Sequence, residues 1–537
     1  MNGFKVKAAR RGTVLAGRLR AALRDERGAT AVFFAMGLLV MAPVTLGLVD
    51  VYMITTQRSQ LQDALDTATL YAARSDKTTT EDIQVVGDNS LRANLKLSGG
   101  QQITYSRFTL DGIKVISTAR ISPPTIGPRL WVQNDIEANS EVLRNSNNVE
   151  VAVVLDTTGS MSDQMTNLRT AAKDLVDLVV KDKQPPEAPY YTKVALVPYA
   201  VGVNVGSWAD TARGSVKGPI AVDSVTADSS KRKIIVKAVA HGFQTGDRVL
   251  FENMGRAKVD GNSMAAEFKV TREDADRFSL SDYSNSKFSG SYNSGGKVYC
   301  LKEGCEKFSF TNVSNKLKTF GIGKCVSERI GSEAYTDAAP SAAPVGRLYD
   351  DGSGNACESQ PIIPLSSNKT MLKGKIDALR DGGSTAGQIG LAWGWYMVSP
   401  NWNALWTSDS APAAYNTPQT LKVVILMTDG AFNSPYCKGV IAKDAGSGSG
   451  SSSDHINCNA TNGDPFDQAD TLCTNMKAKG VIVYTVGFNV GNDSDVKNLM
   501  SNCATSPEYV YMPSNGNDLK IAFRAIAQDI NSLRISK

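Results

Sequence analysis

An uncharged, mainly apolar run from Ala29 to Val49 constrains this 537-residue chain more than any other feature. A helix of that length covers a bilayer core of about 30 Å at about 1.5 Å per residue. Eight Lys and Arg residues precede Gly28, opposed by only two acidic residues, and Asp50 is the first charged residue after the run. The positive-inside rule then predicts a basic cytoplasmic leader at 1–28 and places nearly everything else outside.

The same run could instead be a cleaved signal peptide. It is long for a signal, however, and no small-x-small cleavage site follows it. Pro43 would bend a spanning helix without excluding it. A small apolar stripe at helical spacing continues from Leu61 to Ala72. We therefore expect an anchor in the membrane via residues 29–49, within a transmembrane helix over 29–75 that continues outside. A plain juxtamembrane helix packing on the soluble body is the alternative.

Composition limits the classes of partner and the compartment. The chain has 42% hydrophobic and 21% charged residues, and its net charge of +5 is small for its length, so we predict no nucleic-acid partner. All eight cysteines follow the apolar run, and this even number favours disulfides in an oxidising compartment. No CxxC pair occurs and only two histidines are present, which argues against a zinc site. Sequence does not determine the connectivity, but we expect the pairs Cys473–Cys503 and Cys437–Cys458.

Apolar runs of strand length alternate with amphipathic helical segments from Val149 onward. This alternation predicts an α/β domain with a doubly wound, mostly parallel sheet, formed by 148–202 and 361–537. Ahead of it, strand-like runs predict a small β-rich region at 84–146. The expected strands are 149–155, 191–199, 421–427, 481–487 and 508–512, and the expected helices are 162–180, 368–380, 387–398, 466–479, 493–503 and 516–534.

Two segments of different character interrupt the α/β pattern. The first, 203–360, contains short β-type runs separated by Gly, Asp and Asn. These runs predict a small inserted β domain at about 215–299, followed by a Cys-containing loop region at 300–360. The second segment, 431–464, includes a run of glycine and serine from Gly446 to Ser453, for which we expect a flexible surface loop.

Three loops of the α/β domain carry hard oxygen donors, and ligands of open α/β sheets bind at the carboxyl ends of strands. Carboxylate and hydroxyl oxygens suit Mg²⁺ or Mn²⁺, with Ca²⁺ as the weaker candidate. The alternative is that these residues only cap helices and stabilise turns, and Ser384 could compete with its neighbour as the hydroxyl donor. The candidate metal ligands are Asp156, Thr158, Ser160, Thr385 and Asp429.

The order and spacing of these five residues, with a glycine after the last Asp, resemble the metal-ion-dependent adhesion site of the von Willebrand factor type A family. The resemblance covers about 148–202 and 365–535. It implies that the three hydroxyls bind the ion directly and that at least one Asp acts through water. It also implies that an acidic residue of a partner completes the coordination.

The segment Arg27 to Ala35 resembles the start of Tad/Flp pilus assembly proteins, Arg-Gly-x-x-x-Val-Glu-Phe-Ala. Phe33 stands where the pseudopilins of that family carry Glu, so we do not expect prepilin-peptidase cleavage after the Arg-Gly pair. A type A domain behind such a start is similar to the TadG-like members, as are segments 390–400 and 523–534. The resemblance implies that 84–146 is pseudopilin-like.

Two smaller features carry weaker expectations. The segment Ala240 to Val249 resembles a small β module of ubiquitin-activating enzymes and phage tail proteins, without implying ubiquitin chemistry. Asp454, His455, Asp464 and Asp467 could form a second ion site. We favour the alternative, in which they are solvated loop charge and Asp464 caps a helix.

These resemblances together imply a membrane-anchored, extracytoplasmic pilus assembly or adhesion protein. Its expected partners are a protein ligand offering an acidic residue and the pilus or other Tad components. The implied location is the bacterial inner membrane, single-pass, with the C-terminal domain in the periplasm; the cell surface is the alternative. A structural scaffold or mechanosensor of the envelope, whose metal site binds no ligand, is the second hypothesis. An enzyme is not expected, because the chain has neither GxSxG nor HExxH and only two histidines.

Overall fold

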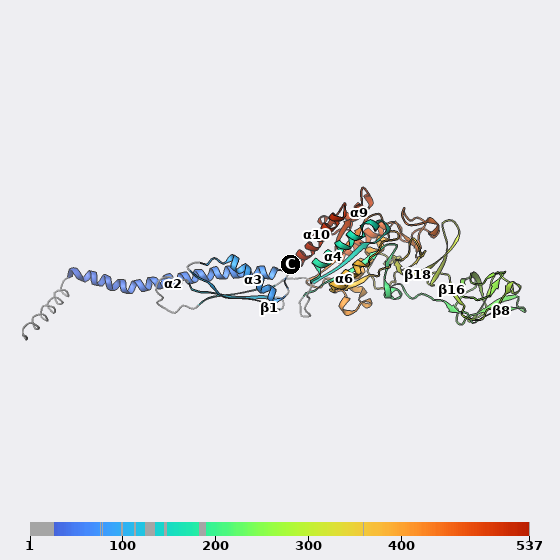
Figure 1. Ribbon diagram of the computed structural model, residues 1–537, viewed down its shortest axis with the longest axis horizontal. Helices are drawn as coiled ribbons and strands as arrows, with labels where there is room; N and C mark the ends of the chain where they lie inside the picture. Colours follow the sequence, from blue (N-terminus) through green and yellow to red (C-terminus); the bar gives the residue numbers. More distant parts are fainter. Residues whose placement is uncertain are drawn as a thin grey trace, which may run out of the picture. The chain divides into compact units, whose positions relative to one another are not determined.

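The structure, a computed structural model, describes residues 26–75, 77, 79–97, 100–111, 114–123, 135–143, 148–181, 190–357 and 359–535 (Figure 1). Most of the leader predicted at 1–28 therefore lies outside the described residues. The chain divides into two compact units, Met1–Arg144 and Asn145–Lys537. The apolar run belongs to the first unit, and the three candidate metal loops belong to the second.

Helix α2 (Glu26–Arg74) contains both the apolar run and its continuation. Among the described residues, it is the helix that is long and apolar enough to cross a membrane. Large apolar side chains between Val32 and Tyr52 are exposed, for example Phe33 and Leu39 at 74% and 75%. The apolar stripe from Leu61 to Ala72 is buried. The helix thus exposes its first half and packs its second half on the rest of the unit.

The buried half of α2 packs against an antiparallel sheet. In the described part of the first unit this sheet consists, in chain order, of β1 (Ile103–Asp111), β2 (Lys114–Ile121) and β3 (Ile136–Leu143). Leu61 and Leu65 of α2 share a core with Phe108, Val115 and Ala119 of the strands.

Helix α3 (Thr80–Asn94) corrects the expectation of a β-rich region from residue 84. Its N-terminus is capped by Thr79, whose hydroxyl oxygen accepts a hydrogen bond from the Asp82 N–H at 3.2 Å. Its buried residues follow helical spacing, but one of them is Gly87, where a Cβ would collide with the ring of Phe108. A glycine contributes nothing to an apolar stripe, so the helical periodicity of this segment is weak in the sequence.

The second unit is built on a mixed, mostly parallel sheet, which agrees with the alternation of strands and helices in the sequence. Within the described residues its strand order is β20-β5-β4-β21-β24-β25, and only β20 at one edge runs antiparallel to its neighbour. The bounds are β4 (Asn148–Asp156), β5 (Thr192–Tyr199), β20 (Ile363–Ser366), β21 (Thr420–Thr428), β24 (Ile482–Gly487) and β25 (Val510–Tyr511).

Helices pack against both faces of this sheet. Val151 and Val153 of β4 face a core shared with α4, α6 and α10, whereas Ala152 and Val154 face a core shared with α7, α8 and α9. Because successive residues enter two different cores, β4 is continuously apolar from Val151 to Leu155. The bounds are α4 (Met165–Val179), α6 (Lys369–Asp377), α7 (Gly387–Val398), α8 (Pro465–Ala478), α9 (Ser494–Cys503) and α10 (Gly516–Ile535).

Between β5 and β20 the chain forms a separate β core that includes Val236, Phe251 and Phe278. Its main sheet has the order β7-β16-β10-β13-β14-β9-β8 (Figure 1). The elements from here to residue 300 are β6 (Val203–Asn204), α5 (Ala209–Arg213), β7 (Ile220–Ala221), β8 (Ser224–Asp228), β9 (Lys233–Lys237), β10 (Arg248–Glu252), β11 (Lys258–Val259), β12 (Asn262–Ser263), β13 (Glu267–Arg272), β14 (Arg277–Leu280), β15 (Phe288–Ser289) and β16 (Lys297–Cys300).

The region expected as loops at 300–360 contains a further antiparallel sheet. It consists of β17 (Lys307–Thr311), β18 (Leu317–Ser327) and β19 (Gly346–Asp350), and β6 pairs with β18. Phe308 and Phe310 of β17 alternate inward into a small core. This period of two is the strand signal, and it is short enough to be hidden among the turns around it.

The second insertion, 431–464, contains β22 (Tyr436–Cys437) and β23 (Val440–Ile441). The run expected as a surface loop, 446–453, is exposed at six of its eight residues, and Ser449 within it is buried. All eight cysteines lie in the described part of the chain and form Cys300–Cys305, Cys325–Cys357, Cys437–Cys458 and Cys473–Cys503. Both pairs expected from the sequence are therefore confirmed.

Candidate metal centre

The first predicted loop begins where β4 ends. Asp156 is the last residue of β4 and is fully buried. Its Oδ1 accepts hydrogen bonds from the N–H of Thr158 at 3.0 Å and from the Thr158 hydroxyl at 2.6 Å. The chain then enters the 3-10 helix η1 (Gly159–Gln164), which carries the next predicted ligand, Ser160. The buried carboxylate thus organises the turn that presents both hydroxyls.

The third predicted loop lies beside the first. Asp429 follows β21, the parallel neighbour of β4. The hydroxyl of Ser160 donates to Oδ1 of Asp429 at 2.8 Å, and the oxygens of Thr158 and Ser160 are 2.9 Å apart. The N–H of Asp429 also lies 3.4 Å from Oδ2 of Asp156. Four of the five predicted ligands therefore form one hydrogen-bonded chain at the carboxyl edge of two adjacent strands.

Thr385 is brought to the same edge by backbone contacts. The N–H of Gly382 donates to the Thr157 carbonyl at 2.9 Å, and the N–H of Gly159 donates to the Gly383 carbonyl at 3.1 Å. The first and second loops are thus paired. Thr385 itself has no side-chain hydrogen bond to the described residues, so it is next to the hydrogen-bonded chain rather than part of it.

Ser384, the alternative hydroxyl donor, is bonded elsewhere. It is 2% exposed, and its Oγ accepts a hydrogen bond from the Ser434 hydroxyl at 2.8 Å. This contact favours Thr385 over Ser384 as the hydroxyl available to the candidate site.

Two residues that the sequence did not single out complete the surroundings of Asp156. Its Oδ2 accepts hydrogen bonds from the Thr428 hydroxyl at 2.8 Å and from the Tyr199 hydroxyl at 3.0 Å. Thr428 and Tyr199 end the strands on either side of β4. The carboxyl ends of predicted neighbouring strands were the available signal, since side chains there meet at one edge of the sheet.

Burial and mutual repulsion disfavour the charged forms of the Asp156 and Asp429 carboxyl groups. Burial raises the pKa of Asp156. Burial, together with the nearby charge of Asp156, raises the pKa of Asp429 to about 7. Among the described residues, neither carboxylate forms a salt bridge. A cation between the loops would stabilise both charges.

The donor set fits a hard dication. A hydroxyl has a single proton and two lone pairs, so the hydroxyls of Thr158 and Ser160, which contact each other and one carboxylate each, also bring acceptor lone pairs together here. A cation suits such converging lone pairs. The described residues contain no group of three or more His, Cys, Asp or Glu side chains that could hold a metal. The candidate site instead has two carboxylates, and its other donors are hydroxyls.

The four residues considered for a second ion site do not converge. Asp464 caps α8, accepting a hydrogen bond from the Phe466 N–H at 2.7 Å. Asp454 forms a salt bridge with Lys318 at 2.8 Å. The interpretation as a helix cap and loop charge therefore holds for these two residues.

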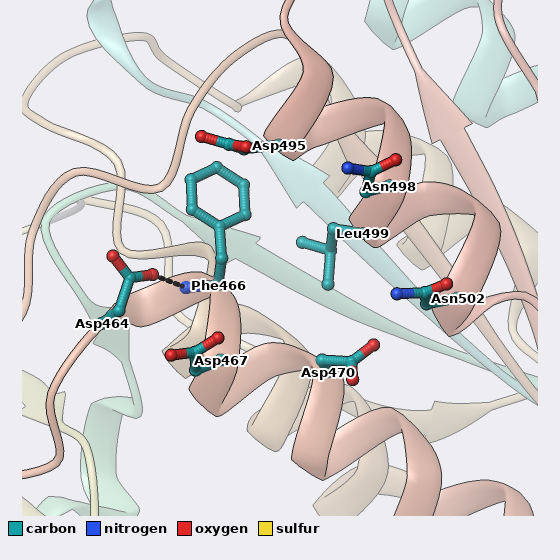
Figure 2. A pocket seen from close by; sticks show the side chains of 8 residues that line it. All are labelled: Asp464, Phe466, Asp467, Asp470, Asp495, Asn498, Leu499 and Asn502. Carbon is teal, nitrogen blue, oxygen red and sulfur yellow. Dashed lines mark hydrogen bonds between the residues drawn. The ribbon is translucent and has the colours of Figure 1, made fainter.

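A separate acidic cavity of about 390 Å³ lies between α8 and α9. Figure 2 shows Asp495 of α9 beside the ring of Phe466 and Asp470 of α8 below Leu499, with the cap of α8 by Asp464 drawn as a dashed line. None of the five predicted metal ligands lines it. The lining residues are Asp464, Phe466, Asp467, Asp470, Asp495, Asn498, Leu499 and Asn502.

Comparison with solved structures finds similar chains among pilus proteins. The pilus adhesin SpaC of Lactobacillus rhamnosus GG is 13% identical, with a TM-score of 0.29 over 82% of this chain and 36% of that one. This chain thus spans about a third of the SpaC structure. The von Willebrand factor domain of the type V pili tip protein Mfa5 of Porphyromonas gingivalis is 11% identical, with a TM-score of 0.33, covering 73% and 97%. The adhesive tip pilin GBS104 of Group B Streptococcus agalactiae is 11% identical, with a TM-score of 0.28, covering 69% and 98%.

Comparison at the level of sequence concerns the N-terminal segment. No curated protein sequence matches the chain. Residues 28–75 match the family described as "Putative Flp pilus-assembly TadE/G-like". The match begins within the Arg-Gly motif and ends at the C-terminus of α2, so it covers the anchor and its buried continuation. The resemblance seen at the start of the sequence is therefore confirmed as a match of residues 28–75 to this TadE/G-like family.

Proposed function

We propose that this chain is a membrane-anchored, extracytoplasmic protein of pilus assembly or adhesion, and that its α/β unit is a von Willebrand factor type A domain. In this proposal the unit binds an acidic residue of a protein partner through Mg²⁺ or Mn²⁺. The observation that carries the proposal is the hydrogen-bonded chain from Asp156 through Thr158 and Ser160 to Asp429. The TadE/G-like match of residues 28–75 supports the pilus context.

The proposed roles of the residues follow from their surroundings. The hydroxyls of Thr158, Ser160 and Thr385 would hold the ion, and the carboxylates of Asp156 and Asp429 would balance its charge. A dication bound by so few carboxylates attracts a further one from a partner. Of the five residues, Ser160 is exposed to solvent and Asp429 is half-buried, so this side of the site is open to a partner.

The anchor sets where this site would operate. The exposed apolar first half of α2 and its basic N-terminal flank support an extracytoplasmic location for the second unit. Four disulfides in the described part of the chain agree with an oxidising compartment. We propose a single-pass protein of the bacterial inner membrane whose binding unit faces the periplasm.

The test removes donors that are least needed for folding. Ser160→Ala and Asp429→Ala are compared with Asp163→Ala, which removes an exposed carboxylate from the same 3-10 helix as Ser160. We expect the first two variants to lose Mn²⁺ binding in a calorimetric titration of the full-length protein in detergent, and to lose pilus assembly or surface attachment. The control should retain both.

Two results would separate the hypotheses. If Ser160→Ala and Asp429→Ala lose metal binding but cells still assemble pili and attach, the protein is a scaffold whose ion only stabilises the fold. If the wild-type protein binds neither Mg²⁺ nor Mn²⁺, the metal-dependent part of the proposal is wrong.

A further inference from the structure

The Thr385 loop, Gly382–Thr385, belongs to no helix or strand that would fix its backbone. It lies between α6 and α7, and its glycines at 382 and 383 have positive φ angles of 156° and 77°. A loop with two such glycines has many alternative conformations. A hydroxyl on it can only be presented reproducibly if other parts of the chain fix the backbone.

Two asparagines, Asn355 and Asn433, supply such contacts and form what we name the asparagine clamp. Oδ1 of Asn355 accepts a hydrogen bond from the Ser384 N–H at 2.9 Å. Oδ1 of Asn433 accepts one from the Thr385 N–H at 3.0 Å. The N–H of Asn433 also donates to the Thr385 carbonyl at 2.9 Å. The two consecutive amides of the loop are therefore each held by the side chain of a different asparagine.

The side-chain N–H groups of Asn355 and Asn433 hold the glycine- and serine-rich segment, 446–453. Nδ2 of Asn355 donates to the Ser449 carbonyl at 2.8 Å, and Nδ2 of Asn433 donates to the Ser447 carbonyl at 3.0 Å. Each asparagine thus joins the backbone of the Thr385 loop to the backbone of 446–453. A segment with the composition of a flexible linker is used here as a rigid support.

The glycines of that segment are explained by the same contacts. A Cβ on Gly448, whose φ is 87°, would lie 2.9 Å from Nδ2 of Asn433. A Cβ on Gly450, whose φ is 94°, would collide with Nδ2 of Asn355. Glycine is therefore required at both positions by the clamp as well as by the backbone conformation.

The clamp residues come from both insertions. Asn355 lies two residues before Cys357, which is bonded to Cys325. Asn433 lies just before Cys437, and the glycine- and serine-rich segment lies within the loop closed by Cys437–Cys458. Cys325–Cys357 lies within the first insertion, and Cys437–Cys458 lies within the second. The clamp therefore connects both insertions to the Thr385 loop.

From these contacts we infer that Asn355 and Asn433 are positioning residues of the Thr385 loop, and that the glycine- and serine-rich segment of the second insertion is its support. The inference rests on the proposed function, in which Thr385 is a metal ligand. Partners of a metal ligand orient it, and their loss lowers metal affinity by about 10- to 100-fold.

The first experiment measures the loop without any metal. Hydrogen exchange is followed on the peptide containing Ser384 and Thr385 in the full-length, metal-free protein in detergent. We expect Asn355→Ala and Asn433→Ala each to accelerate exchange about 5- to 10-fold, since each amide loses its acceptor. The matched control is Asn312→Ala. Asn312 is buried and holds the Ser453 carbonyl at 2.7 Å, so it anchors the same segment without contacting the Thr385 loop.

The second experiment titrates the same proteins with Mn²⁺. The clamp variants should bind Mn²⁺ about 10- to 100-fold more weakly than the wild type, and Asn312→Ala should bind it normally. Gly448→Ala should weaken binding in the same way. Gly463→Ala is its control, because Gly463 has a similar φ of 77° with nothing within 4 Å of a Cβ.

The outcomes distinguish the two proposals. Unchanged exchange in both clamp variants, or equal acceleration in Asn312→Ala, overturns the positioning role. Normal Mn²⁺ affinity in the clamp variants, with binding lost in Asp429→Ala, also overturns it but leaves the metal site supported. Accelerated exchange in the clamp variants of a protein whose wild type binds no Mn²⁺ supports the clamp and overturns the metal site.

Discussion

A buried ion pair joins the two strands that carry Asp156 and Asp429. Glu150 of β4 and Lys422 of β21 are in register, and their side chains are 0% and 5% exposed. Lys422 Nζ donates to Glu150 Oε2 at 2.6 Å and to the Val398 carbonyl at 2.9 Å. Glu150 Oε1 accepts hydrogen bonds at 2.8 Å from Tyr191 and from the Ala413 N–H. Both charges are therefore fully paired away from water.

Lys422→Met removes one partner and leaves the other charge buried. The Glu150 carboxylate keeps two donors on Oε1 but loses the one donor that the described residues supply to Oε2. We expect the free energy of unfolding to fall by about 3–5 kcal/mol, as for other broken buried pairs. The double variant Lys422→Met/Glu150→Gln has no buried charge and keeps an acceptor for the donors on Oε1. Its cost should be about 1–3 kcal/mol, for the polar groups left without partners.

The assay is urea unfolding of the full-length protein in detergent, followed by tryptophan fluorescence. Five of the six tryptophans lie between 208 and 406, so the signal reports the second unit. The control is Lys373→Met, which breaks an ion pair of similar length at the surface, with 2.7 Å between Lys373 Nζ and Asp177 Oδ2. Its loss should lower the free energy of unfolding by less than about 1 kcal/mol. The reasoning is refuted if Lys422→Met costs no more than this control. It is also refuted if the double variant is no more stable than Lys422→Met alone.

Three further predictions concern the stability of the second unit in the same assay. Gly394→Ala places a Cβ 2.5 Å from a valine methyl group of β4 and should destabilise by about 1–3 kcal/mol, whereas Gly374→Ala in α6, with nothing within 4 Å, should be neutral or stabilising. Burial raises the pKa of Glu328 from 4.5 to about 7. The contribution of Glu328 to the free energy of unfolding is therefore fully present below about pH 4.5. About 3 kcal/mol of that free energy is lost as pH rises through about 7. Glu328→Gln should flatten this pH dependence. Replacing Cys473 and Cys503 by Ser should cost about 3.6 kcal/mol, since the pair closes a loop of 30 residues; an unchanged urea midpoint would contradict this.

The α/β part of the fold was predictable because its signals are strong and local. Strands buried on both faces are continuous apolar runs, and the expected bounds of β4, β5, β21 and β24 agree with the structure to within one residue. Helix α3 was missed because glycine stands at one of its buried positions. The β17–β19 sheet was missed because β17 and β19 are short and the longer β18 has no regular alternation of buried and exposed residues. In both cases packing against distant strands decides the structure, and no local pattern records that packing.

The candidate site was predictable only where its residues follow a pattern in the chain. The positions of Asp156, Thr158 and Ser160 are set by one turn, and Asp429 follows from the end of a strand. Tyr199 could have been found from the end of its own strand. Asn355 could not, because it lies in an insertion and reaches Ser384 across 29 residues of sequence. The hydrogen bonds of Asn355 depend on a loop conformation, and no periodic pattern in the sequence predicts that conformation.

The glycines of α7 connect the packing of this helix to the candidate site. Trp393 and Trp395 are 1% exposed and are therefore core residues. A Cβ on Gly390 would lie 2.6 Å from the ring of Tyr199, so the ring fits beneath the helix only because this residue is glycine. From that position the Tyr199 hydroxyl reaches Asp156 Oδ2. A larger residue at 390 must displace the ring, and the hydroxyl with it, so the surroundings of the first ligand depend on the helix that follows the Thr385 loop.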